Sequence, residues 1–293
     1  MAWMQLCVFT RTPDFAEEIL STHGAEAVSF LDGADTPILE PLPGETPLWP
    51  DTVTVGWFMD TTDLAPAKAA LIEAMPEGAS LRMESALIED QDWVRVWLEN
   101  WPPQKFGESL WVVPTQKRAE VTEPGATILL LDPGLAFGTG THPTTALCLE
   151  WLSGADLKGK TVLDFGCGSG ILAIAALLLG AERAVCVDID PQALTATSNN
   201  AEANGVEARI VTLLPAEFTP AEYDVVLANI LANPLMQLAP LLSQCAKPQA
   251  ALVMAGLLDH HAEEVRAAYQ KNFHFDADVT REGWTRLSAQ SVK

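Results

Sequence analysis

The sequence predicts an α/β protein: a doubly wound, mostly parallel sheet preceded by a smaller α+β domain. From about residue 109 onward, strands that are apolar throughout alternate with amphipathic helices, a pattern typical of a parallel sheet covered by helices on both faces. The first ninety residues instead follow the order strand, helix, strand, strand, helix, strand, which is that of a ferredoxin-like unit. The length of 293 residues is sufficient for a large domain and a smaller companion.

The first domain, residues 1–90, carries clear helix boundaries. Its first helix is expected to begin at Pro13, with Thr12 as its cap and Gly24 beyond its end, because proline suits the first helical turn and glycine the position after the last. The expected elements are a strand at 3–10, this helix, strands at 25–32 and 52–59 around a Pro- and Gly-rich loop, a helix at 64–75 and a strand at 79–88.

A tryptophan-rich segment, 91–108, is expected to link the two domains. Trp93, Trp97 and Trp101 recur at every fourth position, which places three indoles on one face of a helix. The two prolines that follow stop the helix. The tryptophans fit a connecting helix packed on a domain, or an aromatic platform for a ligand.

The second domain, residues 109–293, is expected to carry the ligand site, because ligands in such sheets bind at the carboxyl ends of the strands. The residues just after each strand are therefore the candidates for chemistry. The expected strands lie at 126–132, 160–166, 183–190, 208–214, 223–230 and 250–256, and the helices start near 143, 171, 191, 234 and 259.

The formal net charge is −22, and the first ninety residues hold sixteen acidic against three basic side chains. General binding to a phosphate backbone needs clustered Lys and Arg, so direct nucleic-acid binding is not expected. The acidity serves solubility in one interpretation and attracts a basic partner in the other. Its concentration in the first domain favours a basic partner that docks there.

The composition indicates a cytoplasmic protein. The longest apolar run, 171–179, is about half the length that a membrane span needs, and the N-terminus has neither a basic leader nor a long apolar block. Five scattered cysteines without a C-x-x-C pair argue against a disulfide framework or a zinc site. We expect no membrane association and no metal.

A glycine-rich turn, DFGCGSG at 164–170, follows an apolar strand and opens the next helix. Gly166, Gly168 and Gly170 let the backbone approach a ligand, and N–H groups at the helix start point outward. A dinucleotide site would show G-x-G-x-x-G, whereas here the third glycine comes one place early. This D-x-G-x-G-x-G spacing, which begins at Asp164, is similar to the first motif of class I S-adenosylmethionine-dependent methyltransferases. The alternative is a purely structural turn.

An acid ends the following strand. Asp188, eighteen residues after Gly170, stands where a carboxylate accepts hydrogen bonds from both hydroxyls of a ribose, and an acid there disfavours the 2′-phosphate of NADP. The other interpretation is a helix N-cap, a role that Asp190 fits better because Pro191 follows it.

Asn229 lies at the end of the strand expected at 223–230. Amino-methyltransferases that resemble this chain place an N/D-P-P-Y motif there, and the Asn oxygen can accept a hydrogen bond from a substrate amine. Ile230, Leu231 and Ala232 replace the two prolines and the aromatic residue, whose absence favours a tetrahedral amine over a planar base. The alternative is an ordinary Asn at a strand end.

A second glycine-containing loop, DPGLAFGTGTHPTT at 132–145, precedes the glycine-rich turn and is expected to cover a ligand. Pro143 suits a helix start, and the hydroxyls of Thr141, Thr144 and Thr145 lie near it. His142 is a candidate general base or metal ligand, but no second ligand stands at metal-binding spacing.

Together with DIDPQA and ANILANPL, these motifs closely resemble the bacterial ribosomal protein L11 methyltransferase family over the whole chain. The resemblance implies that the C-terminal domain binds S-adenosylmethionine and methylates amines of L11, at its N-terminus and at lysine side chains. It also implies that the N-terminal domain grips L11. The implied cofactor contacts are Thr145, Gly166, Asp188 and Asn229, with Phe137, Gly138, Thr139, Gly140 and Thr141 over the cofactor and Ile230 beside the transferred methyl group.

Two other functions stay open at this point. A methyltransferase that acts on RNA or a small metabolite would share the cofactor site, although the acidic first domain and the missing aromatic residue disfavour RNA. A non-catalytic protein that senses S-adenosylmethionine would share the site as well. Transfer of a labelled methyl group to a defined acceptor separates these functions.

Overall fold

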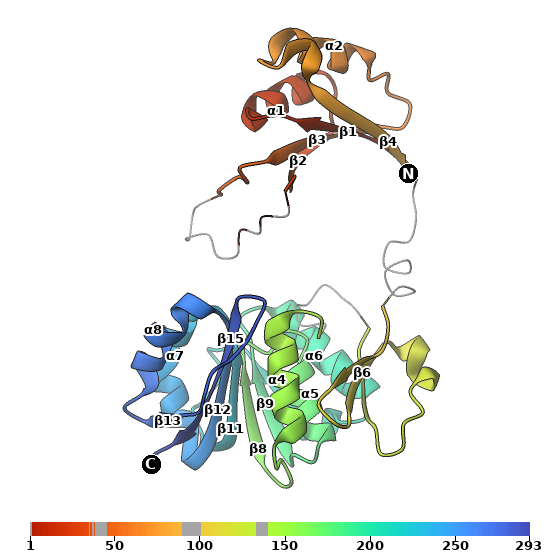
Figure 1. The fold of residues 1–293 in the computed structure, drawn as a ribbon. Helices are drawn as coiled ribbons and strands as arrows, with labels where there is room; N and C mark the ends of the chain where they lie inside the picture. Colours follow the sequence, from red (N-terminus) through yellow and green to blue (C-terminus); the bar gives the residue numbers. More distant parts are fainter. Residues whose placement is uncertain (1, 35, 37, 39–45, 90–100, 133–139) are drawn as a thin grey trace. The chain divides into compact units, whose positions relative to one another are not determined.

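The chain forms two compact units, Met1–Trp93 and Val94–Lys293 (Figure 1). The computed structural model describes the chain apart from residues 1, 35, 37, 39–45, 90–100 and 133–139. The expected linker helix with Trp93 and Trp97 lies outside the described residues, so its existence stays a prediction. Each unit is described below by itself.

The end of the expected linker segment is a strand. Gln104–Phe106 form β5, which pairs antiparallel with β6 (Leu110–Val113), and β6 pairs in parallel with β7 (Thr127–Leu130). Trp101 is 5% exposed and packs in the core of the second unit. The second unit therefore begins ahead of residue 109, because β5 and β6 build a three-stranded sheet that the sequence analysis did not predict.

The first unit is a four-stranded antiparallel sheet in the order β2-β3-β1-β4, which confirms the ferredoxin-like prediction. Two helices lie on one face of this sheet (Figure 1), and the core between them holds Leu6, Leu20, Phe58 and Leu71, all fully buried. Thr12 precedes the first helix as expected, but its side chain makes no capping hydrogen bond. The elements are β1 (Trp3–Phe9), α1 (Pro13–Thr22), β2 (Ala27–Asp32), β3 (Thr52–Met59), α2 (Ala65–Ala74), η1 (Gly78–Ser80) and β4 (Arg82–Ile88).

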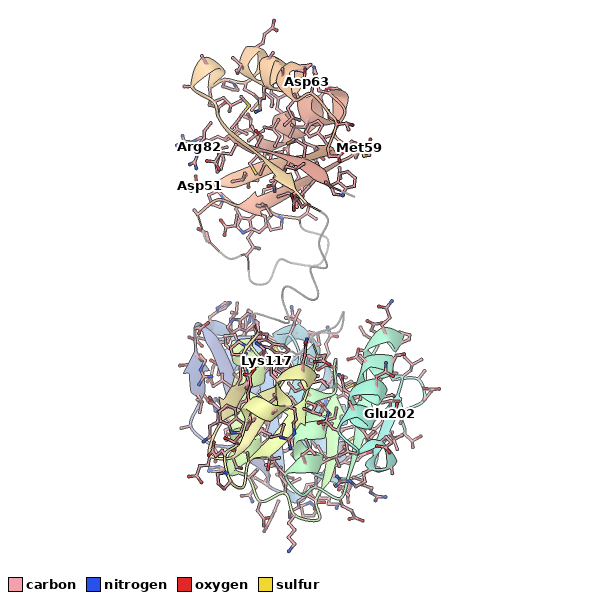
Figure 2. All side chains as sticks on the ribbon, turned by 90° about the vertical axis from the view of Figure 1, so that its right-hand side faces the viewer. Asp51, Met59, Asp63, Arg82, Lys117 and Glu202 are labelled. Carbon is pink, nitrogen blue, oxygen red and sulfur yellow. The ribbon has the colours of Figure 1, made fainter. Side chains whose placement is uncertain are left out.

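Charged side chains lie on the surfaces of both units. Asp51, Asp63 and Arg82 of the first unit and Glu202 of the second are exposed (Figure 2). The acidic excess of the first unit is therefore carried at least partly by carboxylates that solvent or a partner can reach. Among the helices that the structure describes, none is both long enough and apolar enough to span a bilayer.

The second unit is built on an eight-stranded sheet whose main path runs β10-β9-β8-β11-β12-β15-β13. The pairs from β10 to β12 are all parallel, and β15 joins antiparallel to β12, which confirms the mostly parallel doubly wound prediction. The elements are α4 (Pro143–Gly154), β8 (Thr161–Phe165), α5 (Ile171–Leu178), β9 (Arg183–Val187), α6 (Pro191–Ala203), β10 (Ile210–Leu213), β11 (Tyr223–Asn229), α7 (Ala232–Cys245), β12 (Ala246–Leu258), α8 (Ala262–Tyr269), β13 (Phe273–Phe275), β14 (Val279–Arg281) and β15 (Trp284–Ser291), with short 3-10 turns η2 (Thr115–Glu120), η3 (Glu207–Arg209) and η4 (Asp259–His261).

Apolar side chains of the central strands alternate between two cores, one on each face of the sheet. In β11, Val225 and Leu227 pack in the core that α4 and α5 cover, whereas Val226 and Ala228 pack in the core that α7 and α8 cover (Figure 1). This arrangement explains why the strands read as continuous apolar runs, because both of their faces are buried.

The strand order reverses at β8. The chain proceeds from β8 to β9 and β10 on one side and returns to β11 and β12 on the other. The carboxyl ends of β8 and β11 therefore flank a topological switch point, which is where open α/β sheets bind their ligands. The glycine-rich turn follows β8, and Asn229 is the last residue of β11.

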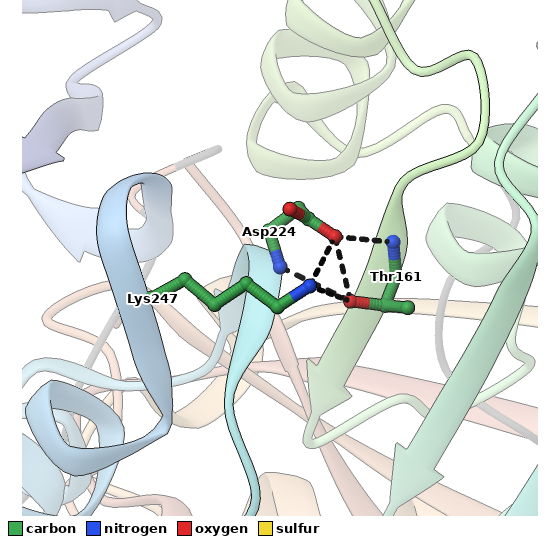
Figure 3. Close-up of polar contacts among 3 residues, drawn as sticks. All are labelled: Thr161, Asp224 and Lys247. Atoms are coloured by element: carbon green, nitrogen blue, oxygen red, sulfur yellow. Dashed lines mark hydrogen bonds and ion pairs between the residues drawn. The ribbon is translucent and has the colours of Figure 1, made fainter.

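A polar network joins three central strands near their amino-terminal ends, at the end of the sheet opposite the switch point (Figure 3). Asp224 Oδ2 accepts hydrogen bonds from Lys247 Nζ at 2.8 Å and from the Thr161 hydroxyl and N–H at 2.8 and 2.9 Å. Burial alone would raise the pKa of Asp224, but the hydrogen bonds from Lys247 and Thr161 outweigh it and lower the pKa to about 2. The carboxylate thus links β8, β11 and β12 at the end of the sheet away from the switch point.

We expect the free energy of unfolding of the Asp224→Asn protein at pH 7 to be about 1 kcal/mol lower than that of the wild type, because the charge-assisted hydrogen bonds are lost from a partly exposed site. A depressed folded pKa stabilises the protein above the unfolded pKa of about 3.9. The difference between the two proteins should therefore shrink as pH falls below about 4 toward 2. Urea titrations at several pH values check this, with Asp60→Asn, at an exposed position, as control. A difference that stays constant down to pH 2 would contradict it.

Candidate active site

The glycine-rich turn is tied to the neighbouring strand by its backbone. The N–H of Gly166 donates to the carbonyl of Val187 at 2.7 Å, and the N–H of Gly168 donates to Asp188 Oδ2 at 2.9 Å. Gly166 has a φ of +81°, and a Cβ there would overlap Cγ2 of Ile230. The turn therefore requires glycine at 166, because side chains rarely adopt this φ and because Ile230 occupies the space.

Asp188 lies directly after β9, as expected. Its Oδ2 holds Gly168, and its Oδ1 accepts from the N–H of Asp190 at 3.0 Å. Asp190 is the residue that caps α6, since its side chain accepts from the N–H of Gln192 at 2.8 Å. Each oxygen of Asp188 keeps a second acceptor site, which suits a carboxylate that accepts from two ribose hydroxyls.

Ile189 was not singled out from the sequence. Its side chain is 83% exposed although it stands between two acids next to the sheet edge. An aliphatic group this exposed beside a polar turn is suited to contact the flat face of a ligand. The only sequence signal for it was its place between Asp188 and Asp190.

Asn229 and Thr145, which are 84 residues apart in the chain, meet at the end of β11. Asn229 Nδ2 donates to the Thr145 hydroxyl at 3.3 Å. Within the part of the chain that the structure describes, Asn229 Oδ1 is buried and accepts no hydrogen bond. An unpaired buried acceptor costs about 1 to 3 kcal/mol, so this oxygen marks a position where a ligand donor would be bound favourably.

Ile230 lies between two glycines. It packs against Gly166 on one side, and its N–H donates to the carbonyl of Ala255 at 3.1 Å. On the other side a Cβ on Gly256, whose φ is +85°, would lie 2.7 Å from the Ile230 carbonyl carbon and 2.9 Å from its nitrogen. Gly256 was missed in the sequence, where the signal was a glycine inside a long apolar strand.

Asp164 is buried beneath the glycine-rich turn at 1% exposure. Its Oδ2 accepts from the N–H of Ala173 at 3.2 Å, while its Oδ1 has no partner within the described ranges. Burial raises the pKa of Asp164 to about 7, and the charge of Asp188 adds to the rise although the Ala173 N–H opposes it. Its contact with the cofactor stays a prediction.

His142 has a structural role in the fold. It caps α4, and its Nδ1 lies 2.8 Å from the Thr144 hydroxyl, while its ring stacks edge-on against Trp284 with 4.8 Å between centroids. Burial lowers its pKa, and Glu282 opposes the shift. No group of three or more potential metal ligands occurs in the ranges covered by the structure.

The loop before α4 is described only in part. Phe137, Gly138 and Thr139 lie outside the described residues, so their expected place over the cofactor is untested. Gly140 is buried near Phe106 and Ile171, and Thr141 is exposed.

The site thus combines a backbone turn without side chains, a carboxylate with two spare acceptor positions, and an orphaned amide oxygen. The first two fit a nucleoside with vicinal hydroxyls, as S-adenosylmethionine carries. The third fits an acceptor amine. These groups lie on the carboxyl ends of adjacent strands, within one edge of the sheet.

Comparisons with known proteins show the family to which the chain is similar. The family model for ribosomal protein L11 methyltransferase matches residues 2–292. The ribosomal protein L11 methyltransferase of Aeromonas salmonicida is 48% identical to this chain over 293 residues. That of Pseudomonas aeruginosa is 51% identical to this chain over 294 residues. Each match covers 99% of this chain and 99% of the relative. The solved structure of ribosomal protein L11 methylase from Lactobacillus delbrueckii subsp. bulgaricus has a TM-score of 0.60 and 31% identity, covering 66% of this chain and 100% of that chain.

Proposed function

The chain belongs to the ribosomal protein L11 methyltransferase family, and we propose that it transfers methyl groups from S-adenosylmethionine to lysine side chains and the N-terminal amine of ribosomal protein L11. The observation that supports the proposal is Asn229 Oδ1, which is buried at the switch point and to which none of the described residues donates a hydrogen bond. This oxygen accepts a hydrogen bond from the amine that receives the methyl group.

S-adenosylmethionine, when bound, supplies a methyl group on a positively charged sulfur. Asp188 would accept hydrogen bonds from the ribose hydroxyls, and the turn from Gly166 to Gly170 would let the nucleoside lie against bare backbone. Thr145 holds the amide of Asn229, so that its oxygen is fixed in direction. Ile230 covers the turn and keeps water away from the reacting groups.

The acceptor amine must be neutral to attack the methyl carbon. At pH 7, deprotonating a lysine with a pKa of ~10.4 costs about 4.6 kcal/mol, whereas an α-amine near ~7.8 costs about 1 kcal/mol. Desolvation by Ile230 and the nearby positive sulfur both favour the uncharged amine. Asn229 then aims the nitrogen at the methyl carbon, and such positioning supplies a large share of the rate. No separate base is needed.

The first unit docks L11 in this proposal. Its acidic excess, sixteen acidic against three basic residues in the first ninety, suits a basic protein partner and disfavours nucleic acid. The exposed carboxylates Asp51 and Asp63 (Figure 2) belong to this charge. A reaction on a ribosomal protein is consistent with a cytoplasmic enzyme.

The test uses S-adenosylmethionine labelled in its methyl group, incubated with the protein and purified L11, ribosomal RNA or a mixture of small amines. Label on L11 is expected, on lysine and N-terminal amines by mass spectrometry. Label only on RNA or a small amine would replace the proposed substrate. Binding without any transfer would identify a sensor instead of an enzyme.

A further inference from the structure

A row of polar side chains runs along α6 and its end. Thr197, Asn200 and Asn204 are three and four positions apart, a spacing that places them on one side of a helix. Thr197 is fully buried and the two asparagines are half-buried, whereas the neighbouring Asn199 is exposed. The row therefore faces into the protein although it is polar.

Two members of this row hold the glycine-rich turn. The Thr197 hydroxyl donates to the carbonyl of Gly168 at 3.0 Å, and Asn200 Nδ2 donates to the carbonyl of Ser169 at 2.8 Å. Because each peptide is planar and trans, fixing a carbonyl also fixes the direction of the N–H on the same peptide. α6 thus sets the orientation of the turn on which the nucleoside lies.

The third member holds β7, the last strand of the small sheet. Asn204 Oδ1 accepts from the N–H of Leu130 at 2.8 Å, and its Nδ2 donates to the carbonyl of Leu130 at 2.8 Å. The side chain pairs with Leu130 as a neighbouring strand would. Its Nδ2 also donates to the backbone carbonyl of Asn200 at 2.8 Å, which links the two anchor points.

Leu130 is the last residue of β7. One face of α6 is therefore bonded both to the glycine-rich turn of the large sheet and to the last strand of the small one.

We propose that Asn200 and Asn204 are positioning residues that hold the glycine-rich turn, through α6 and its attachment to β7, in the orientation the cofactor requires. The inference rests on the proposed use of S-adenosylmethionine and deepens it. Both residues act through the backbone of the turn and of β7, so they change cofactor affinity and leave recognition of the protein substrate unchanged.

The experiment compares Asn200→Ala and Asn204→Ala with the matched control Asn199→Ala, which makes the same change on the exposed side of α6. Calorimetry measures the Kd for S-adenosylhomocysteine, and steady-state kinetics measures KM for S-adenosylmethionine and for L11. We expect Kd and the cofactor KM to rise roughly tenfold in each asparagine variant, since each loses one or more hydrogen bonds of the scaffold. The KM for L11 should stay within about twofold of the wild-type value in both variants. In Asn199→Ala all three constants should stay within about twofold of wild type.

A second control separates positioning from general destabilisation. Asp224→Asn loosens the far edge of the sheet, and it should lower the melting temperature without changing Kd. Should Asn204→Ala not fold, Asn204→Asp keeps the acceptor for the Leu130 N–H and loses only the donors. Kd values equal to that of Asn199→Ala, or a rise that Asp224→Asn reproduces at a similar melting temperature, would overturn the proposal. If the wild type binds no S-adenosylhomocysteine, the proposed function fails first, and the inference falls with it.

Discussion

The Asn229→Ala protein is expected to bind S-adenosylmethionine nearly as well as the wild type and to turn over about 10² to 10³ times more slowly. Alanine removes a buried oxygen that accepts no hydrogen bond from any residue the structure describes, and whose amide is held in direction by Thr145. Removing one preorganised polar group that is aimed at the reacting atom lowers the rate by a factor on this scale. The cofactor keeps its contacts with the glycine-rich turn and Asp188, which lie on the neighbouring strands.

Single-turnover kinetics gives the rate of methyl transfer, and calorimetry gives the cofactor Kd. The matched control is Asn233→Ala, the same substitution four residues later at an exposed position of α7. Thr145→Val should give an intermediate rate, because Asn229 is then present but no longer held. A loss of cofactor affinity as large as the loss of rate would assign Asn229 to cofactor binding alone.

The core of the second unit could be predicted from the sequence because its strands are buried on both faces. β8, β9 and β11 read as apolar runs between turn signals, and the residues that follow them carry the motifs. β15 escaped the same reasoning. Its buried positions include Thr285, Ser288 and Ser291, so the strand shows no apolar run although it pairs with three others.

The small sheet was missed for a related reason. β5 has three residues and β6 four, lengths at which local pattern carries little information. What stabilises them is their contact with each other and with β7, together with Trp101 in the core. The tryptophan spacing predicted a helix up to the prolines at 102 and 103, and no strand was expected in the short stretch that follows them.

In the site, local sequence identified the glycine-rich turn, Asp188 and Asn229, because each follows a predicted strand. It did not reveal which of them meet. Thr145 reaches Asn229, and Asn204 reaches Leu130, across 84 and 74 residues of chain. Such pairs can be identified only when the strand order and the helix packing are known, since no periodicity in the sequence relates the two residues.

Gly256 contacts Ile230, another pair that local sequence does not reveal, and we expect a substitution there to have a large effect on turnover. In the Gly256→Ala protein the new Cβ would overlap the carbonyl oxygen of Ile230 and approach its carbonyl carbon to 2.7 Å, so the segment after Asn229 must move. Ile230 has little room on its other side, because it already packs against Gly166. A displacement of about 1 Å at a reacting group can cost about a hundredfold in rate, and we expect turnover to fall by about that factor.

Gly125→Ala is the matched control for this substitution. Gly125 has a φ of +81°, close to the +85° of Gly256, but a Cβ there would meet nothing within 4 Å. Both variants should lose about 1 to 2 kcal/mol of stability from the left-handed backbone, and Gly256→Ala should lose more because its Cβ also meets the Ile230 backbone. Turnover should fall only in Gly256→Ala. Equal turnover in the two variants would mean that Ile230 yields without disturbing Asn229. The amide would then be held in place by Thr145 and not by the packing of the strand end.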